Sequence, residues 1–210
     1  MAVPFLLLPF AMMLAGTAAP DPAAGIVAEL NRVRADPPAY ARELAGFRRR
    51  YAGRIVREAG EPIDRITVEG VAALDEAVAA LRRQPPVGPL ATQPALAWAA
   101  GDHIARQGSA GLLGHLGPEG STPLDRVLKR GLRPFAVGEV IAYGPRDAAA
   151  VVRELIIDDG VPDRSHRLAI FDPVFSRAGA ACGPHARFGL MCVVDLASAA
   201  DAPVRARPIR

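Results

Sequence analysis

The chain has 210 residues, of which 50% are hydrophobic, 22% are charged and 5% are aromatic, and its formal net charge is +3. This length and composition predict one folded domain with a sizeable core and exclude a disordered chain of low hydrophobicity. The densest basic run is Arg48-Arg49-Arg50, followed by Arg54 and Arg57. These cations are too few for a phosphate-neutralising surface, so we expect no nucleic-acid partner.

The N-terminal segment has the pattern of a secretory signal peptide. An apolar run from Val3 to Ala15 is followed by small residues and then by a polar stretch with prolines. The run is shorter than the roughly 20 apolar residues that span a bilayer. We therefore expect residues 1–19 to be removed, leaving a secreted or periplasmic protein with no transmembrane span. An uncleaved N-terminal anchor is the alternative, because no lysine or arginine precedes the apolar run.

Residues 20–85 are expected to form a helical N-terminal extension. Apolar residues recur there with helical period, and Asp36 before two prolines is a typical helix cap. The predicted helices cover residues 23–34, 38–51 and 69–83. Residues 52–68 are mixed in character and are predicted to be a loop. The stretch QPPVGPL cannot be helical and ends the extension.

Residues 86–198 are expected to be the main domain, followed by a disordered tail over residues 199–210. Further helices are predicted over residues 94–107, 123–130 and 148–157, the last of them capped by Asp147. Two strand-like runs, residues 177–182 and 190–196, are apolar at nearly every position. Both faces of their sheet should therefore be covered. A covered sheet with many helices indicates a layered α/β fold with helices on both sides.

The two cysteines, Cys182 and Cys192, lie one in each strand-like run. Opposed positions on antiparallel neighbours would bring the side chains close enough for a disulfide, which an exported protein favours. Cross-strand geometry often suits a bridge poorly, so two buried free thiols are the alternative.

Four histidines are the first candidates for chemistry. We expect His103 to pack inside its helix and His185 to be a solvated turn residue. His115 lies in the glycine-rich loop GLLGHLGPEG, where the backbone can fold closely around a site, and His166 lies in the polar stretch DDGVPDRSHR. The sequence has no HExxH, GxSxG or CxxC motif, which excludes the familiar zinc-protease, serine-hydrolase and redox signatures.

Between these two histidines, Glu139 stands in the strand-like stretch VGEVIAYG. A carboxylate in such an apolar setting would be partly buried and would need a partner. A glutamate on the exposed edge of a strand is the alternative. In DDGVPDRSHR, Arg164 and Arg167 are expected to form salt bridges or face solvent, and an ordinary acidic surface turn is the alternative for the whole stretch.

Three stretches, in the order GHLGPEGS, GEVIAYG and VVRELIIDDGVPDRSHRLAIFDPVFSRAGAACG, resemble the CAP superfamily. Its members include cysteine-rich secretory proteins, antigen 5 and plant pathogenesis-related proteins. The resemblance covers about residues 86–197 and is nearest to the bacterial exported members. It implies a three-layer α-β-α sandwich with a central, mainly antiparallel sheet, here preceded by the helical extension.

The resemblance also implies a cleft that holds two histidines and two acids. By motif, His115 and His166 match the histidines and Glu139 matches the first acid. The family's spacing gives Asp158 as the second acid, whereas the buried face of helix 148–157, if extended, gives Asp159. We expect the second acid to be Asp158, with Asp159 as the alternative. Val140 stands where the family motif carries asparagine, and Ser165 where a glycine is common.

Two neutral imidazoles suit zinc or another divalent metal, and in some members of the family the histidines bind such an ion. Nearby carboxylates would orient the imidazoles or act as general bases. We therefore expect a cleft that binds a lipid, glycan or protein ligand, with His115 and His166 as metal ligands. The alternatives are a metal-assisted hydrolase, in which Glu139 and Asp158 serve with the histidines, and a structural tetrad that only holds loops together.

Overall fold

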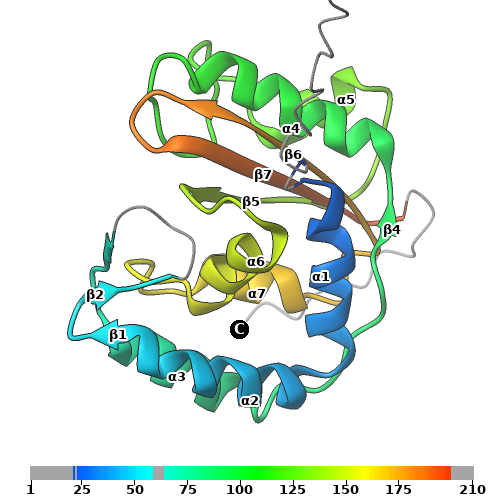
Figure 1. Cartoon of the computed structure of the whole chain (residues 1–210). Helices are drawn as coiled ribbons and strands as arrows, with labels where there is room; N and C mark the ends of the chain where they lie inside the picture. Colours follow the sequence, from blue (N-terminus) through cyan, green and yellow to red (C-terminus); the bar gives the residue numbers. More distant parts are fainter. Residues whose placement is uncertain (1–20, 22, 59–63, 200–210) are drawn as a thin grey trace, which may run out of the picture.

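The computed structural model of the chain describes residues 21, 23–58 and 64–199 (Figure 1). The expected signal peptide, residues 1–19, lies outside this part, as does the expected tail apart from Ala199. Within the described residues, no helix combines the length and the apolar character needed to cross a bilayer.

The central sheet has four strands in the order β4-β6-β7-β5. They are β4 (Ala91–Thr92), β5 (Val137–Tyr143), β6 (Arg177–His185) and β7 (Gly189–Ala197). The three long strands pair antiparallel, whereas the two-residue β4 pairs parallel with β6. The prediction of a mainly antiparallel central sheet is confirmed.

Helices cover both faces of this sheet, so the predicted three-layer α-β-α sandwich is also confirmed (Figure 1). One layer consists of α4 (Pro94–Gln107) and α5 (Pro123–Lys129). The other consists of α1 (Ala23–Ala35), α6 (Ala148–Ile157) and α7 (Ser165–Phe171). Arg34 of α1 is buried and donates hydrogen bonds to the carbonyl oxygens of Gly88, Ile170 and Phe175, which fixes α1 against the rest of its layer.

The strands carry apolar residues on both faces because both faces are covered. Ile141, Met191 and Val193 belong to a core cluster with α4, whereas Val140 and Val194 belong to the larger cluster with α1 and α6. Side chains alternate between the faces of a strand. This alternation places Glu139 on the α4 side of β5, and the β5–β7 register sets Asp195 directly opposite it.

The segment that precedes the sheet forms a further layer below α6. It contains α2 (Pro37–Phe47), the 3₁₀ turn η1 (Arg48–Arg50) and α3 (Val71–Leu81). The predicted loop over residues 52–68 is wrong in part, because β1 (Tyr51–Ala52), β2 (Ile55–Val56) and β3 (Arg65–Ile66) pair into a small antiparallel sheet. Strands of two residues leave too short a pattern of alternation to be detected in a sequence.

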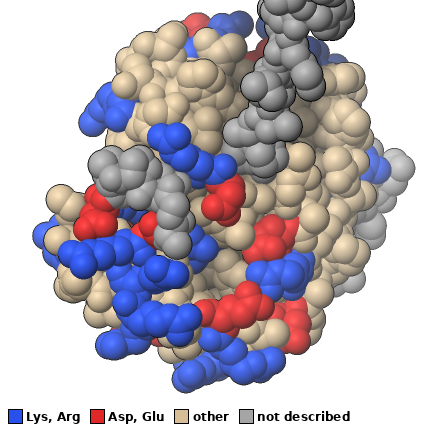
Figure 2. All heavy atoms as spheres, viewed as in Figure 1, with Lys and Arg blue, Asp and Glu red and all other residues tan. Residues whose placement is uncertain are grey.

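Basic side chains predominate on the face of this segment that Figure 2 shows, and acidic side chains lie beside them. Figure 2 shows arginine or lysine atoms in blue beside red carboxylates around β1, α2 and α3, whereas the surface over β6 and β7 is mostly uncharged. Arg48 of the basic run is paired with Asp75 at 3.0 Å.

Capping signals located most helix boundaries. The Asp36 carboxylate accepts a hydrogen bond from the Ala39 N–H, and that of Asp147 accepts one from the Ala150 N–H. Helices α4 and α6 have the predicted bounds, and α1 and α5 differ from prediction by one residue. The predicted helix 38–51 is too long, because it tightens into the 3₁₀ turn after Phe47, one residue beyond the weak helix former Gly46.

Cys182 and Cys192 face each other across the β6–β7 pair, with Cα atoms 4.1 Å apart, and their sulfurs are bonded. The bond closes a loop with a sequence separation of 10. Replacing both cysteines with alanine is expected to lower the free energy of unfolding by about 2 kcal/mol, because the unfolded chain regains the freedom of that loop. Urea denaturation of both forms, with thiol titration of the unfolded wild type, measures this; two free thiols would contradict the bond.

Candidate functional site

Glu139 and His115 form the first half of the site. His115 lies in the loop between α4 and α5, and its Nδ1 is 2.9 Å from Oε1 of Glu139. The Glu139 side chain is only 1% exposed, whereas that of His115 is 46% exposed. Because a carboxylate only accepts, Nδ1 of His115 must carry the proton and donate it. The Nε2 atom of a neutral His115 is then a free acceptor.

Asp158 and His166 form the second half with the same geometry. Nδ1 of His166 is 2.7 Å from Oδ1 of Asp158. The other carboxylate oxygen accepts hydrogen bonds from the backbone N–H groups of His166, at 3.0 Å, and Arg167, at 3.2 Å. Asp158 is buried. Through these hydrogen bonds its carboxylate fixes both the His166 ring and the first turn of α7.

The structure places Asp158, and not Asp159, beside His166. Extending the buried face of α6 pointed to Asp159, but the helix ends at Ile157 and Asp158 adopts the left-handed conformation, with φ of 58°. This cap turns the chain before a further helical residue can form. Asp159 instead accepts hydrogen bonds from the N–H groups of Val68 and Glu69, which fastens the segment before α3.

The two histidine rings face each other with centroids 6.1 Å apart and planes tilted by 58°. Four residues that are distant in sequence therefore meet in one place: His115, Glu139, Asp158 and His166. Each imidazole is oriented by a carboxylate on Nδ1, which is the arrangement that commonly supports a metal-binding histidine. Among the described residues, no group of three or more His, Cys, Asp or Glu side chains could hold a metal ion, either at this site or elsewhere.

Arg126 of α5 is a member of the site that the sequence did not reveal. Its side chain is 4% exposed, and Nη2 donates to Oε2 of Glu139 at 2.6 Å and to the carbonyl oxygen of His115 at 3.2 Å. Burial alone would raise the pKa of Glu139. The His115 hydrogen bond and the charge of Arg126 outweigh that effect and hold this pKa below its usual value.

The prediction that His103 is a packing residue of its helix is confirmed, because this side chain of α4 is fully buried. Its Nε2 donates to the carbonyl oxygen of Gly114 at 2.9 Å, which ties the His115 loop to the helix. Burial lowers the pKa of His103, so it is neutral at neutral pH. It is 4.0 Å from Glu139 and forms the back wall of the site.

The prediction that His185 is a solvated turn residue is wrong. Strand β6 continues to residue 185, so His185 is 3% exposed and its Nε2 donates to the carbonyl oxygen of Leu112 at 2.9 Å. The expected ion pairs of Arg164 and Arg167 are confirmed, since Arg164 binds Glu69 and Arg167 binds Glu76. His185 therefore supports the His115 loop, and the two arginines support the loop with His166.

Asp195 brings a further carboxyl group behind the site. It is fully buried and lies opposite Glu139 in the β5–β7 register. Burial, followed by the neighbouring Glu139 carboxylate, raises the pKa of Asp195 well above its usual value. The native protein therefore holds this carboxyl group neutral under conditions in which an ordinary aspartate is ionised.

Comparison with known proteins identifies a family for this arrangement. The family model of the cysteine-rich secretory proteins, CAP, matches residues 76–196 and so includes all four residues of the site. The family model begins to match inside α3, at residue 76, whereas the motifs that resemble the family begin only at about residue 86. No curated protein matches the chain significantly.

Three solved bacterial structures are similar at low sequence identity. An outer surface protein from Borrelia burgdorferi is 20% identical, with a TM-score of 0.46, and the match covers 53% of this chain and 79% of that protein. An extracellular SCP-domain protein from Bacillus anthracis is 17% identical, with a TM-score of 0.42 and coverages of 60% and 38%. A cysteine-rich secretory protein from Staphylococcus aureus is 11% identical, with a TM-score of 0.40 and coverages of 61% and 38%. This chain thus spans well under half of the last two proteins.

Proposed function

The chain belongs to the CAP family of cysteine-rich secretory proteins, and we propose that it is exported and binds a ligand in the cleft between His115 and His166. The observation that carries this proposal is the pair of imidazoles whose Nδ1 atoms are held by Glu139 and Asp158. Both Nε2 atoms are left to interact with a ligand. A site prepared in this way loses little side-chain freedom when the ligand binds.

The loop that carries His115 favours a ligand with an apolar portion. Leu112, Leu113 and Leu116 are 43%, 48% and 60% exposed, although they flank a polar site. Exposed apolar residues gathered beside a cleft are typical of interaction sites. A lipid or an apolar protein segment therefore suits this rim better than a purely polar glycan does.

A divalent metal, zinc in particular, fits the donor set as a two-histidine site. His115 and His166 would hold the ion through Nε2, and Glu139 and Asp158 would orient them. A metal bound there would supply a Lewis acid for an anionic or carbonyl group of the ligand. Because the described residues offer only two ligands at this site, we expect weak, exchangeable binding rather than a structural metal centre.

Metal-assisted hydrolysis has less support than binding. A general base needs a carboxylate that is free to take a proton and has a pKa near the working pH. Both oxygens of Glu139 are engaged, one by His115 and one by Arg126, and its pKa is lowered. Asp158 is likewise fully engaged by His166 and Arg167.

Calorimetric titration of zinc into the protein tests the site. We expect saturable binding to the wild type and loss of at least about tenfold in affinity in the His115→Ala/His166→Ala variant. The Asp163→Asn variant is the matched control, because this exposed carboxylate lies on the His166 loop. Equal binding by the double variant would contradict the metal site. Lipid vesicles with and without zinc then test the apolar ligand itself.

A further inference from the structure

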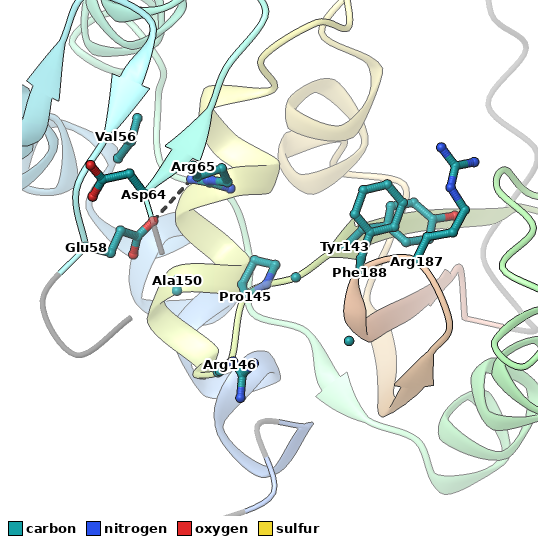
Figure 3. A pocket seen from close by; sticks show the side chains of 12 residues that line it. Val56, Glu58, Asp64, Arg65, Tyr143, Pro145, Arg146, Ala150, Arg187 and Phe188 are labelled. Atoms are coloured by element: carbon teal, nitrogen blue, oxygen red, sulfur yellow. Dashed lines mark hydrogen bonds and ion pairs between the residues drawn. The ribbon is translucent and has the colours of Figure 1, made fainter. Parts of the chain in front are cut away.

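A pocket of about 400 Å³ lies where the end of β5 meets the β6–β7 turn and the small sheet (Figure 3). The aromatic rings of Tyr143 and Phe188 form one wall, and Glu58, Asp64 and Arg65 form the opposite wall. Neither histidine of the cleft lines this pocket. Its size is typical of sites for small molecules.

The aromatic wall is preorganised. The ring centroids of Tyr143 and Phe188 are 5.5 Å apart, and the ring of His185 supports both at 5.2 and 5.3 Å. Phe188 remains 41% exposed, although it is a large apolar residue. A flat apolar group in the pocket would cover this face and gain the ring–ring contacts that aromatic pairs favour.

Three arginines, Arg65, Arg146 and Arg187, and two acids, Glu58 and Asp64, line the pocket, so its charges favour an anion. On the small-sheet side, Glu58 is paired with Arg65 and Arg153, and Asp64 is paired with Arg57, so both acids are neutralised.

On the aromatic side, the guanidinium of Arg187 is 5.4 Å from the Phe188 centroid. Within the part of the chain that the structure describes, this guanidinium has no hydrogen bond or ion pair. Its aliphatic stem packs against Gly111, where an added Cβ would meet Cγ of Arg187 at 3.0 Å.

We propose that this pocket is a second binding site, for a small anionic ligand with a planar apolar ring. The ring lies against Tyr143 and Phe188, and the anionic group pairs with Arg187. A guanidinium suits a carboxylate or sulfonate because it can donate two parallel hydrogen bonds. The proposal does not depend on the function proposed for the histidine cleft, since neither His115 nor His166 is among the residues that line the pocket.

The aromatic wall also connects the pocket to the cleft. The Tyr143 hydroxyl accepts a hydrogen bond from the Gly114 N–H at 3.0 Å, and His185 holds the carbonyl oxygen of Leu112. Both bonds fix the loop that carries His115. A ligand against Tyr143 therefore contacts a residue that positions this loop.

Titration of the full chain with 2-naphthoate and with neutral 2-naphthamide, followed by naphthyl fluorescence, tests the proposal. We expect saturable binding of both, with naphthoate about fivefold tighter, as for an exposed ion pair. The Arg187→Gln variant is expected to bind the two compounds equally. The Phe188→Ala variant is expected to weaken both about tenfold, and Phe188→Leu, which keeps most of the apolar volume, to weaken them less.

Two further variants serve as controls. Arg42→Gln removes an exposed arginine on α2 and is expected to bind both compounds as the wild type does. His115→Ala/His166→Ala is expected to leave binding unchanged, which separates this site from the cleft. The absence of saturable naphthoate binding, equal binding of both compounds by the wild type, or loss of binding in the histidine variant alone would each overturn the proposal.

Discussion

Replacing Arg126 with methionine is expected to lower the free energy of unfolding by about 3–5 kcal/mol. Methionine keeps much of the length of the side chain but removes the cation that is bound to Glu139 at hydrogen-bond distance. The carboxylate would remain 1% exposed with one partner fewer, and the carbonyl oxygens of Ser121 and His115 would lose a donor. An uncompensated buried charge is among the largest single destabilising effects known.

Urea denaturation of Arg126→Met measures this loss, with Arg130→Met as the matched control. Arg130 follows the same short helix and pairs with Asp102, but this pair is 36% and 25% exposed, so its loss should cost less than about 1 kcal/mol. A second change, Glu139→Gln, should restore part of the stability of Arg126→Met, because it removes the unpaired charge. Similar losses for both arginine variants would show that Arg126 is not the counterion of Glu139.

Local signals in the sequence were sufficient for most of the fold. Helices α4 and α6 follow from a proline or aspartate at the start and an apolar period of 3.6 residues. Each of these signals lies within a few residues of the boundary that it determines. The two-residue strands of the small sheet carry no such signal, because their pairing joins residues such as Ile55 and Ile66 that are distant in the chain.

The candidate site could be predicted only in part, for the same reason. His115, Glu139 and His166 stand out by their local settings, but only the resemblance to the family's motifs groups them with Asp158, since no local pattern brings the four together. The choice between Asp158 and Asp159 depended on where α6 ends, and helix ends are the least predictable part of a helix. The left-handed cap at Asp158 decided it.

Arg126 and Asp195 were missed because their partners are set by tertiary contacts. Nothing in the stretch PLDRVLK shows that its arginine reaches a carboxylate on β5, 13 residues later. Asp195 did leave a signal, since it is the single charged residue in the apolar run LMCVVDLA. Its position alternates with Met191 and Val193, which face the core under α4. A carboxyl group at such a position is buried and must have an unusual environment.

Asp195 should therefore limit the stability of the protein above acidic pH, and Asp195→Asn is expected to relieve this limit, so that the variant is the more stable protein at about pH 8. The native state holds the carboxyl proton because burial and Glu139 raise its pKa, whereas the unfolded chain releases it above a pKa of about 3.9. Between these two pKa values the native state binds more protons than the unfolded state. The wild type then loses up to about 1.4 kcal/mol of stability for each rise of one pH unit.

Asparagine is nearly isosteric with a neutral aspartic acid and has no proton to lose, so the variant should lack this pH dependence. The two proteins should be about equally stable near the unfolded pKa, and the advantage of the variant should grow as the pH rises toward the raised native pKa of Asp195. Melting temperatures measured from about pH 4 to about pH 8 test this, with the exposed Asp163→Asn as a control that should follow the wild type. Parallel curves for wild type and Asp195→Asn would mean that Asp195 is ionised in the native protein. Diverging curves would establish that Glu139 lies beside a neutral carboxylic acid at Asp195. Arg126 and His115 then compensate one buried negative charge, that of Glu139, rather than two.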